Sequence, residues 1–165
     1  MAETKIYIKD AVDARLREEA MKRFGYGRGS ISNAVEEAIV QWLMKEDKIR
    51  LSIDKIVEKA RGDREAVAVI IFGSYARREQ SYRDVDIAVL IKDANKASEE
   101  LSQYIDVIGF DGGGLFDVSI VNSLPTDIQS RIFNEGTIVY LKDKDFLYDY
   151  TASLIMKVAD QVAIM

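Results

Sequence analysis

The feature that most constrains the fold is an uninterrupted apolar run from Ala66 to Phe72, which stops at Gly73-Ser74. Its length and its valine and isoleucine content are typical of a strand that is covered on both faces. Further strands are predicted at residues 86–91, 116–121 and 137–141, and helices at 96–108, 126–134 and 146–162. This alternation predicts an α/β or α+β domain with a mixed sheet.

The absence of two residue types limits the chemistry of the chain. Its 165 residues contain no cysteine and no histidine. This excludes disulfides, zinc fingers, thiol nucleophiles and imidazole acid–base catalysis, so any reaction must use carboxylates, hydroxyls, amines or a bound ion. There is no run of about 18 apolar residues, and the N-terminus lacks the pattern of a signal peptide. We therefore expect a soluble, cytoplasmic protein that does not enter a membrane.

The chain is predicted to contain two parts, residues 1–47 and residues 48–165. The first part opens with an alternating segment, Lys5 to Lys9, which predicts a short strand. A helix over 13–24 and three glycines at 25–29 follow. Ser30 is then predicted to cap a helix that reaches residue 44 and is compatible with direct continuation into a helical stretch at 53–60. The first part is therefore a strand-helix-helix module.

Gly73 and Ser74 stand where the first buried strand would turn into a helix. Glycine permits a tight turn and the close approach of a ligand, and a serine at a helix start offers its hydroxyl and free backbone N–H groups to an anion. Such a turn suits a phosphate group. A Gly-Ser pair after a strand is, by itself, usually only a turn.

Three aspartates form the second part of the pattern. Asp84 and Asp86 lie two residues apart at the start of a strand, so their carboxylates point to one side of the sheet and repel each other unless a divalent cation lies between them. Asp117 is a third carboxylate, placed inside a later apolar strand, where a buried charge is costly without a partner. Each aspartate alone is also compatible with a cap or a solvated strand edge. Together they predict an oxygen-rich site of the kind that Mg²⁺ prefers.

The stretch Phe72-Gly73-Ser74-Tyr75-Ala76-Arg77, followed by Asp84-Val85-Asp86-Ile87, resembles the signature of the minimal nucleotidyltransferases of the DNA polymerase beta superfamily. The resemblance continues through Phe116-Asp117-Val118 and residues 136–141. It implies that Asp84 and Asp86 bind two Mg²⁺ ions, and that Asp117 completes the site and helps to activate the attacking hydroxyl. It further implies that Gly73 and Ser74 hold a nucleoside triphosphate. The positive charge of Arg77 suits a phosphate contact as well, and a surface salt bridge is a nearly equal alternative for this residue.

The resemblance implies an enzyme that moves a nucleoside monophosphate, with ATP as the expected donor, to an acceptor hydroxyl. Many nucleotidyltransferases similar to this chain are antitoxins that act beside a helical toxin of the HEPN class, some by adenylylating a toxin tyrosine. A HEPN-class toxin is therefore an expected partner. One residue departs from the family pattern, because Arg78 stands where the family usually has glycine.

The strand-helix-helix module over residues 3–46 is similar to ribbon-helix-helix DNA-binding proteins, in which strands from two subunits pair and enter the major groove. This resemblance implies a homodimer formed through the N-terminal strand. Lys5, Tyr7 and Lys9 would then contact bases, while Gly29 and Ser30 would contact a DNA phosphate. The alternative is a dimerisation module that does not bind DNA.

Two functions from different classes therefore remain open. In the first, the chain is a metal-dependent nucleotidyltransferase. In the second, the nucleotidyltransferase fold is catalytically inactive, and the chain is a binding module or a DNA-binding autoregulator. Acidic residues at all three expected positions favour the enzyme, and the two functions are compatible in one chain.

Overall fold

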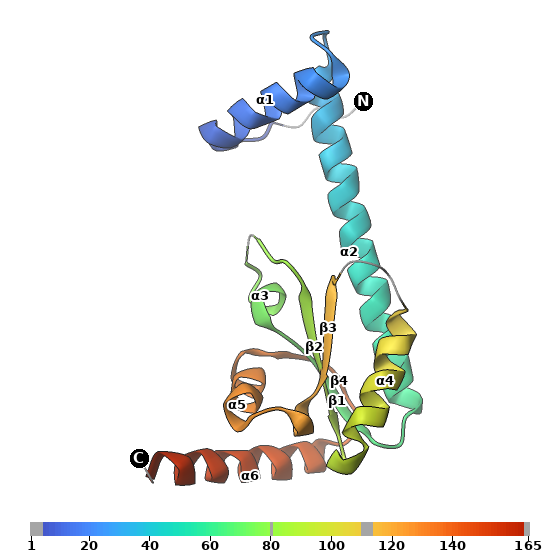
Figure 1. The fold of residues 1–165 in the computed structure, drawn as a ribbon, viewed down its shortest axis with the longest axis vertical. Coiled ribbons are helices and arrows are strands. Elements are labelled where there is room, and N and C mark those ends of the chain that lie inside the picture. The colour runs from blue at the N-terminus through green and yellow to red at the C-terminus, as the bar shows by residue number, and fades with distance from the viewer. Residues whose placement is uncertain (1–4, 80, 110–113, 164–165) are drawn as a thin grey trace. The chain divides into compact units, whose positions relative to one another are not determined.

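The structure is a computed structural model that describes residues 5–79, 81–109 and 114–163 (Figure 1). The chain divides into two compact units, Met1–Lys48 and Ile49–Met165. We refer to them as the N-terminal and the C-terminal unit. Within the described ranges, none of the helices combines the length and the apolar character that a membrane span requires.

The N-terminal unit contains α1 (Asp10–Phe24) and the first part of α2 (Ser30–Gly62). α1 begins three residues before the predicted start, and acidic residues in its first turn and basic residues in its last turn complement the helix dipole. α2 begins at Ser30 as predicted and runs on without a break to Gly62. No glycine or proline interrupts residues 31–61, so nothing in the sequence ends the helix near residue 44.

The predicted strand at Lys5 to Lys9 is not formed in the single chain. Residues 5–9 lie outside every helix and strand of the structure. A strand requires a neighbouring strand that pairs with its N–H and C=O groups, and the described part of one chain places none beside this segment. The prediction of a strand was therefore wrong for the isolated chain, and a ribbon-helix-helix fold is not confirmed.

The C-terminal unit is built on a four-stranded mixed sheet with the order β3-β2-β1-β4. The central strand β1 pairs antiparallel with both β2 and β4, and β2 pairs parallel with β3. The strands are β1 (Ala66–Phe72), β2 (Val85–Ile91), β3 (Phe116–Ile120) and β4 (Thr137–Leu141). The predicted mixed sheet is confirmed, and each strand lies within one residue of its predicted bounds.

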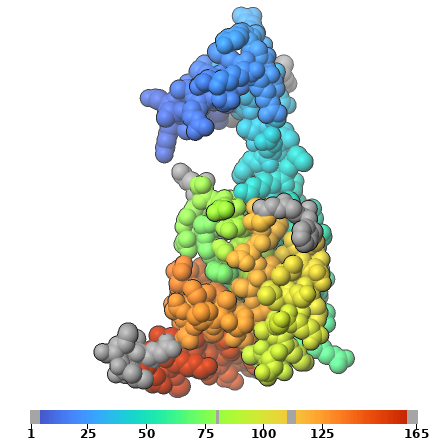
Figure 2. Space-filling model, viewed as in Figure 1, coloured from blue at the N-terminus to red at the C-terminus, as the bar shows by residue number. Residues whose placement is uncertain are grey.

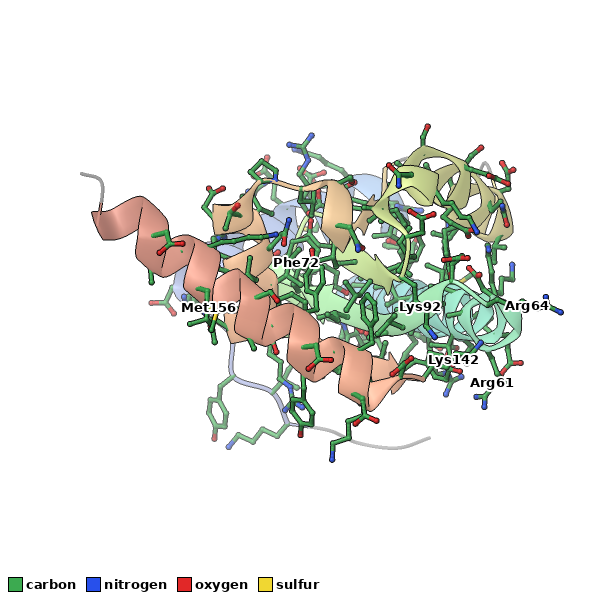
Figure 3. The ribbon with its side chains drawn as sticks, turned by 90° about the horizontal axis from the view of Figure 1, so that it is seen from below. Arg61, Arg64, Phe72, Lys92, Lys142 and Met156 are labelled. Atoms are coloured by element: carbon green, nitrogen blue, oxygen red, sulfur yellow. The ribbon has the colours of Figure 1, made fainter. Side chains whose placement is uncertain are left out.

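The remaining helices connect and cover the strands. They are α3 (Gly73–Ala76), η1 (Ala94–Lys96), α4 (Ala97–Ile108), η2 (Val121–Ser123), α5 (Thr126–Glu135) and α6 (Lys144–Ala163). α4 and β3 adjoin on the face that Figure 2 displays. α6 crosses the sheet, and Met156 on its outer side is 70% exposed (Figure 3).

The sheet has an apolar core on each face. On one face, Ile49 and Ile56 of α2 and Tyr104 of α4 pack with the strands, and on the other face Ile132 of α5 and Leu147 of α6 do so. Burying each of these aliphatic side chains stabilises the fold by about 1.5–3 kcal/mol. β1 and β2 are buried on both faces, as the apolar run of β1 predicted. The two layers fix the strand ends that carry the candidate site.

A buried polar cluster joins the end of α2 to α4. The Lys59 Nζ atom lies 3.3 Å from both Asp63 Oδ2 and Glu100 Oε2, and 4.2 Å from the centre of the Tyr104 ring. The Tyr104 hydroxyl donates a hydrogen bond to Asp63 Oδ2 at 3.0 Å. One cation therefore holds two carboxylates, that of Asp63 directly after α2 and that of Glu100 on α4.

Candidate active site

Gly73 follows β1 as the first residue of α3 and lies directly against Asp86. Its φ of +73° falls in the left-handed region, which L side chains rarely adopt. A Cβ atom at this position would come within 1.9 Å of Asp86 Oδ2. A glycine is therefore required both for the turn into α3 and for the contact between this backbone and the carboxylate on β2.

The three predicted aspartates gather at one end of the β2–β3 pair. Asp86 and Asp117 are direct partners in the parallel register, and neighbouring strands lie about 4.8 Å apart. Asp84 immediately precedes β2. Asp117 is exposed, because β3 is an edge strand, so the expectation that it is a buried charge was wrong. Its register with Asp86, rather than its burial, connects it to the site.

The electrostatics of Asp86 reflect this crowding. Burial, followed by the charges of Asp84 and Asp117, raises the pKa of Asp86 above its ordinary value, while Arg77 and Arg131 act in the opposite direction. A bound divalent cation would relieve this repulsion. Within the described ranges, no group of three or more acidic side chains converges closely enough to hold a metal ion as it stands. Carboxylates without a bound cation repel one another. Their oxygen atoms are nevertheless the ligands that Mg²⁺ prefers, and Mg²⁺ binding here is a proposal.

Arg77 forms surface salt bridges, which was the alternative expected for this residue. Its Nε atom donates to Glu79 at 2.8 Å, and its Nη1 atom donates to Glu135 of α5 at 2.9 Å. The same guanidinium favours the ionised form of Asp86. Ser74 accepts a hydrogen bond from the Glu79 N–H at its backbone carbonyl, at 3.1 Å. Two acidic residues therefore hold the Arg77 guanidinium, whose charge also acts on Asp86.

Arg131 and Glu135 lie beside the candidate site but were not predicted from the sequence. Both lie on α5, far along the chain from the Gly-Ser and Asp-x-Asp motif, and no local spacing distinguishes them from other surface charges. The available signal was the strand that follows them. β4 returns antiparallel beside β1, with Thr137 paired to Ile71, and Glu135 ends α5 two residues before this pair.

Arg78 occupies a backbone conformation that explains the usual glycine of the family. Its φ is +55°, and it is the one non-glycine residue with a positive φ in the described ranges. Its N–H donates to the Tyr75 carbonyl at 3.0 Å, which closes the turn after α3. An arginine in this conformation carries backbone strain that glycine would not. The replacement thus acts on the turn itself.

The predicted DNA-contacting residues lie in the N-terminal unit. Lys5, Tyr7 and Lys9 are all exposed, and the Lys5 Nζ atom lies 5.2 Å from the centre of the Tyr7 ring. Ile6 and Ile8, predicted to form the opposite face, are 55% and 41% exposed. Both faces of this segment are therefore open in the single chain.

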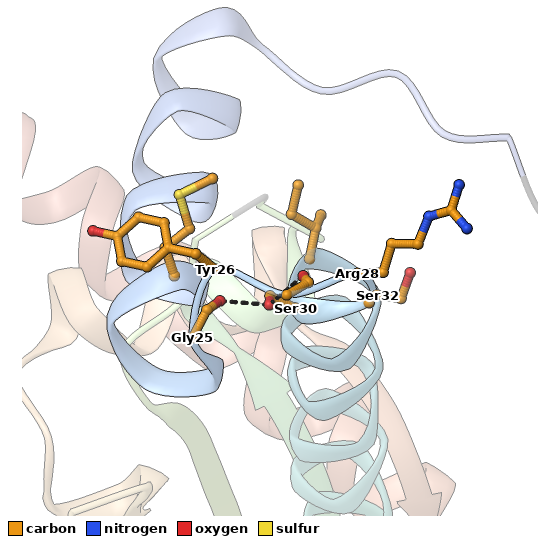
Figure 4. A pocket seen from close by; sticks show the side chains of 9 residues that line it. Gly25, Tyr26, Arg28, Ser30 and Ser32 are labelled. Carbon is orange, nitrogen blue, oxygen red and sulfur yellow. Dashed lines mark hydrogen bonds between the residues drawn. The ribbon is translucent and has the colours of Figure 1, made fainter.

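Gly29 is the last residue of the turn between α1 and α2, and Ser30 is the first residue of α2. Figure 4 shows Ser30 beside Gly25 at this turn. The Ser30 hydroxyl donates to the carbonyls of Gly25 and Gly27 at 2.6 and 2.9 Å, and Ser30 is only 5% exposed. Its single O–H is thus committed to the turn rather than available to a phosphate, and it does not act as the predicted helix cap. Gly29, with φ +98°, allows the chain to enter α2. The turn borders a hollow of about 310 Å³.

The mixed sheet, with a glycine turn after β1 and aspartates on β2, is consistent with the nucleotidyltransferase fold. The family model described as "Polymerase beta, Nucleotidyltransferase" matches residues 54–145. The chain therefore belongs to the polymerase beta nucleotidyltransferase family. No curated protein matches the sequence.

Several solved structures resemble this chain at low identity. A chain of a toxin–antitoxin structure with AMP-PNP is 19% identical, with 68% of this chain and 96% of that chain covered and a TM-score of 0.40. A protein from Shewanella oneidensis is 20% identical, with coverages of 70% and 92% and a TM-score of 0.45. A chain of the tri-AMPylated Shewanella oneidensis HEPN toxin in complex with the MNT antitoxin is 19% identical, with coverages of 73% and 98% and a TM-score of 0.37. The family assignment rests on the match over residues 54–145 alone.

Proposed function

We propose that this nucleotidyltransferase transfers a nucleoside monophosphate, from ATP, to a tyrosine hydroxyl of a HEPN-class toxin, and thereby acts as an antitoxin. The observation that carries the catalytic part is the contact of the Gly73 backbone with Asp86, which is itself in register with Asp117. The acceptor class follows from the sequence resemblance to antitoxin nucleotidyltransferases.

In this proposal, Asp84, Asp86 and Asp117 hold two Mg²⁺ ions. The carboxylate oxygens fit the ligand preference of Mg²⁺, and the raised pKa of Asp86 reflects burial and like charges that a cation would offset. When bound, Mg²⁺ supplies charge neutralisation and lowers the pKa of the acceptor hydroxyl. Gly73 and Ser74 leave room for the phosphate chain beside these carboxylates.

The transfer forms one bond and breaks one. The acceptor oxygen bonds to the α-phosphorus of ATP while the bond from that phosphorus to the β-phosphate bridging oxygen breaks, and pyrophosphate leaves. Asp117 is exposed at the edge strand, where it is accessible to a protein acceptor, and it takes the hydroxyl proton. Arg77 favours the negative charge that accumulates on the departing phosphates.

Incubation with α-labelled ATP and Mg²⁺, with and without the product of the neighbouring gene, tests this proposal. We expect label on the partner protein in the wild type and none with Asp86→Asn. No transfer to any protein, together with no metal-dependent nucleotide binding, would support the alternative in which the fold is catalytically inactive.

We also propose that the N-terminal unit forms a homodimer that binds DNA. The observation that favours it is the exposure of every residue in the alternating segment 5–9, both the polar set Lys5, Tyr7 and Lys9 and the apolar pair Ile6 and Ile8. A triple alanine variant of Lys5, Tyr7 and Lys9 should stay dimeric and lose binding to the promoter of its own gene. Unchanged DNA binding would reject this surface.

A further inference from the structure

We propose that Arg131 of α5 is a second triphosphate-binding residue, which forms a two-arginine clamp with Arg77, and that Glu135 positions both guanidinium groups. This inference rests on the proposed function, because it concerns the phosphate chain of the nucleotide that the site would use. It assigns a role to α5, an element outside the nucleotidyltransferase motif.

The geometry begins with the carboxylate of Glu135. Its Oε2 atom accepts a hydrogen bond from Arg77 Nη1 at 2.9 Å, and its Oε1 atom lies 3.9 Å from Arg131 Nε. One carboxylate therefore contacts an arginine from the turn after α3 and another from the preceding turn of its own helix. This bridge places two cations from different elements side by side.

The backbone fixes Glu135 beside the site. Thr137 pairs with Ile71 in the antiparallel register of β4 and β1, and Glu135 ends α5 two residues before this pair. Gly136 fits tightly, because a Cβ there would come within 2.3 Å of the Ile132 carbonyl oxygen and 2.6 Å of Ile70 Cγ2. The end of α5 thus lies directly on β1, and the position of the bridge is set by packing rather than by the side chains alone.

The two arginines would offset the repulsion between the aspartates and a bound triphosphate. Three carboxylates at the end of β2 and β3 would repel a triphosphate, and Arg77 and Arg131 are the two cations that also favour the ionised form of Asp86. Guanidinium groups bind phosphate oxygens through paired N–H donors. Arg77 has five such donors, and within the described ranges two of them contact Glu79 and Glu135, which leaves the others to a ligand.

Exposure leaves both arginines open to a ligand. The Arg77 and Arg131 side chains are 40% and 61% exposed, and the Glu135 side chain is 40% exposed. A mobile surface arginine loses side-chain entropy when it binds, and the contact with Glu135 reduces that loss. Glu135 thus acts through the arginines and does not itself contact the nucleotide.

The test measures the affinity of the full-length protein for ATP, AMP and adenosine in the presence of Mg²⁺. Arg131→Ala should weaken ATP binding about tenfold or more and leave adenosine binding unchanged, because only the phosphate chain contacts the clamp. Arg131→Lys keeps the charge but loses the paired N–H donors of the guanidinium. Its ATP affinity should lie between those of the wild type and Arg131→Ala. Glu135→Gln should weaken ATP binding about threefold and leave adenosine binding unchanged. Without the Glu135 carboxylate, the two arginine side chains are less ordered and lose more entropy when ATP binds.

Two matched variants on the same helix control for damage to α5. Asp127→Asn repeats the change from carboxylate to amide at an exposed position of the first turn, and Asn134→Ala changes the exposed neighbour of Glu135. Both should bind ATP like the wild type.

An ATP-to-adenosine affinity ratio that Arg131→Ala and Arg131→Lys leave unchanged would overturn the clamp while the proposed function stands. An unchanged or tighter ATP affinity in Glu135→Gln would overturn its positioning role. A wild-type protein that binds no ATP would overturn both the clamp and the proposed function.

Discussion

The two units of the chain differ in how they bury their apolar residues. The C-terminal unit covers both faces of its sheet, and the side chains of β1 and β2 are almost wholly buried. In the described part of the N-terminal unit, Ala20 is the one buried apolar residue, while Ile6, Ile8, Ile39, Trp42 and Leu43 are each at least 41% exposed. A regular apolar pattern therefore predicts an element in both units, but only one unit supplies the surface that covers it.

This difference has a functional consequence. The C-terminal unit places charged residues against a closed core and can hold a defined site within one chain. The N-terminal unit leaves apolar side chains exposed in the single chain, and our proposal is that a second copy of the same unit covers them. The predictions below separate the two cases, because changes in one unit should alter chemistry and changes in the other should alter assembly.

The largest expected effect is the loss of transfer activity in Asp86→Asn. We expect a fall on the order of a thousandfold, because the central carboxylate of the site is removed. Stability should not fall. The raised pKa of Asp86, caused by burial and then by Asp84 and Asp117, means that its charge opposes folding above that pKa.

Label transfer and thermal unfolding at two pH values measure these effects together. The melting temperature of Asp86→Asn should equal or exceed that of the wild type at pH 7, and the difference should vanish in acid, where the native aspartate is protonated. Retained activity with a lower melting temperature would place Asp86 among structural residues.

Gly73→Ala tests the contact between backbone and carboxylate. A Cβ would lie 1.9 Å from Asp86 Oδ2, so the two groups must move apart. A shift of about 1 Å in an active site costs about a hundredfold in activity. Gly109→Ala is the matched control, because its φ of +76° brings the same backbone strain with no described atom within 4 Å. Steady-state kinetics and melting curves of both variants measure this. Equal activity losses in the two would contradict a specific role for Gly73.

For the N-terminal unit, a double Ile6→Lys, Ile8→Lys variant should weaken dimerisation by about a hundredfold or more. Each isoleucine contributes about 1.5–3 kcal/mol when it is covered. Sedimentation velocity measures the assembly, and the single tryptophan, Trp42, should report it by a red shift of its emission when it becomes uncovered on dilution. Lys5→Ala with Lys9→Ala should remain dimeric. A wild type that stays monomeric at high concentration would refute the assignment.

Asp63→Asn should lower the free energy of unfolding by about 1–3 kcal/mol at pH 7. Burial acts to raise the pKa of Asp63, but hydrogen bonds from the Glu65 N–H, Glu100 and Tyr104, with the charge of Lys59, bring that pKa below its ordinary value. Its contribution is therefore present above the pKa of an unfolded aspartate and is lost as the pH falls through the lower value in the folded state.

Urea unfolding at neutral and acid pH measures this dependence. Glu100→Gln is the control, because burial and the neighbouring Asp63 raise the pKa of Glu100. Glutamine imitates the protonated form that the fold favours, so it should cost less at pH 7. A larger loss in Glu100→Gln than in Asp63→Asn would reverse this assignment of charges.

The smallest expected effect is a gain of about 1 kcal/mol in stability for Arg78→Gly. Glycine adopts a φ of +55° without the strain that a side chain brings. Chemical denaturation measures the gain, and nucleotide affinity should not fall. Reduced stability in this variant would show that the Arg78 side chain stabilises the turn.

The sequence predicted the features that depend on local pattern. β1 and β2 were found because their apolar runs are buried on both faces, and the spacing of Asp84 and Asp86 placed them correctly at the start of β2. Strand order is not local, so Asp117 was expected to be buried and is exposed at the edge. Arg131 and Glu135 were missed for the same reason, since only the pairing of β4 with β1 brings α5 to the site.

The segment at residues 5–9 shows the other limit. Its alternation of apolar and polar residues is a strand pattern, but strand formation depends on a pairing partner, which a single chain does not supply here. Ser30 was correctly predicted at the start of α2, yet its hydroxyl donates to carbonyls of the preceding turn. The hydrogen-bond partners of the Ser30 hydroxyl depend on the backbone path of the preceding turn. A serine in the sequence does not by itself determine that path.

Titration with Mn²⁺, followed by electron paramagnetic resonance in the presence of ATP, tests the central claim most directly. We propose that Asp84, Asp86 and Asp117 together hold the divalent ions beside Gly73. The account predicts that the wild type removes the signal of free Mn²⁺ beyond what ATP alone removes, and that Asp86→Asn and Asp117→Asn do not. Equal Mn²⁺ binding by the wild type and both variants would contradict it.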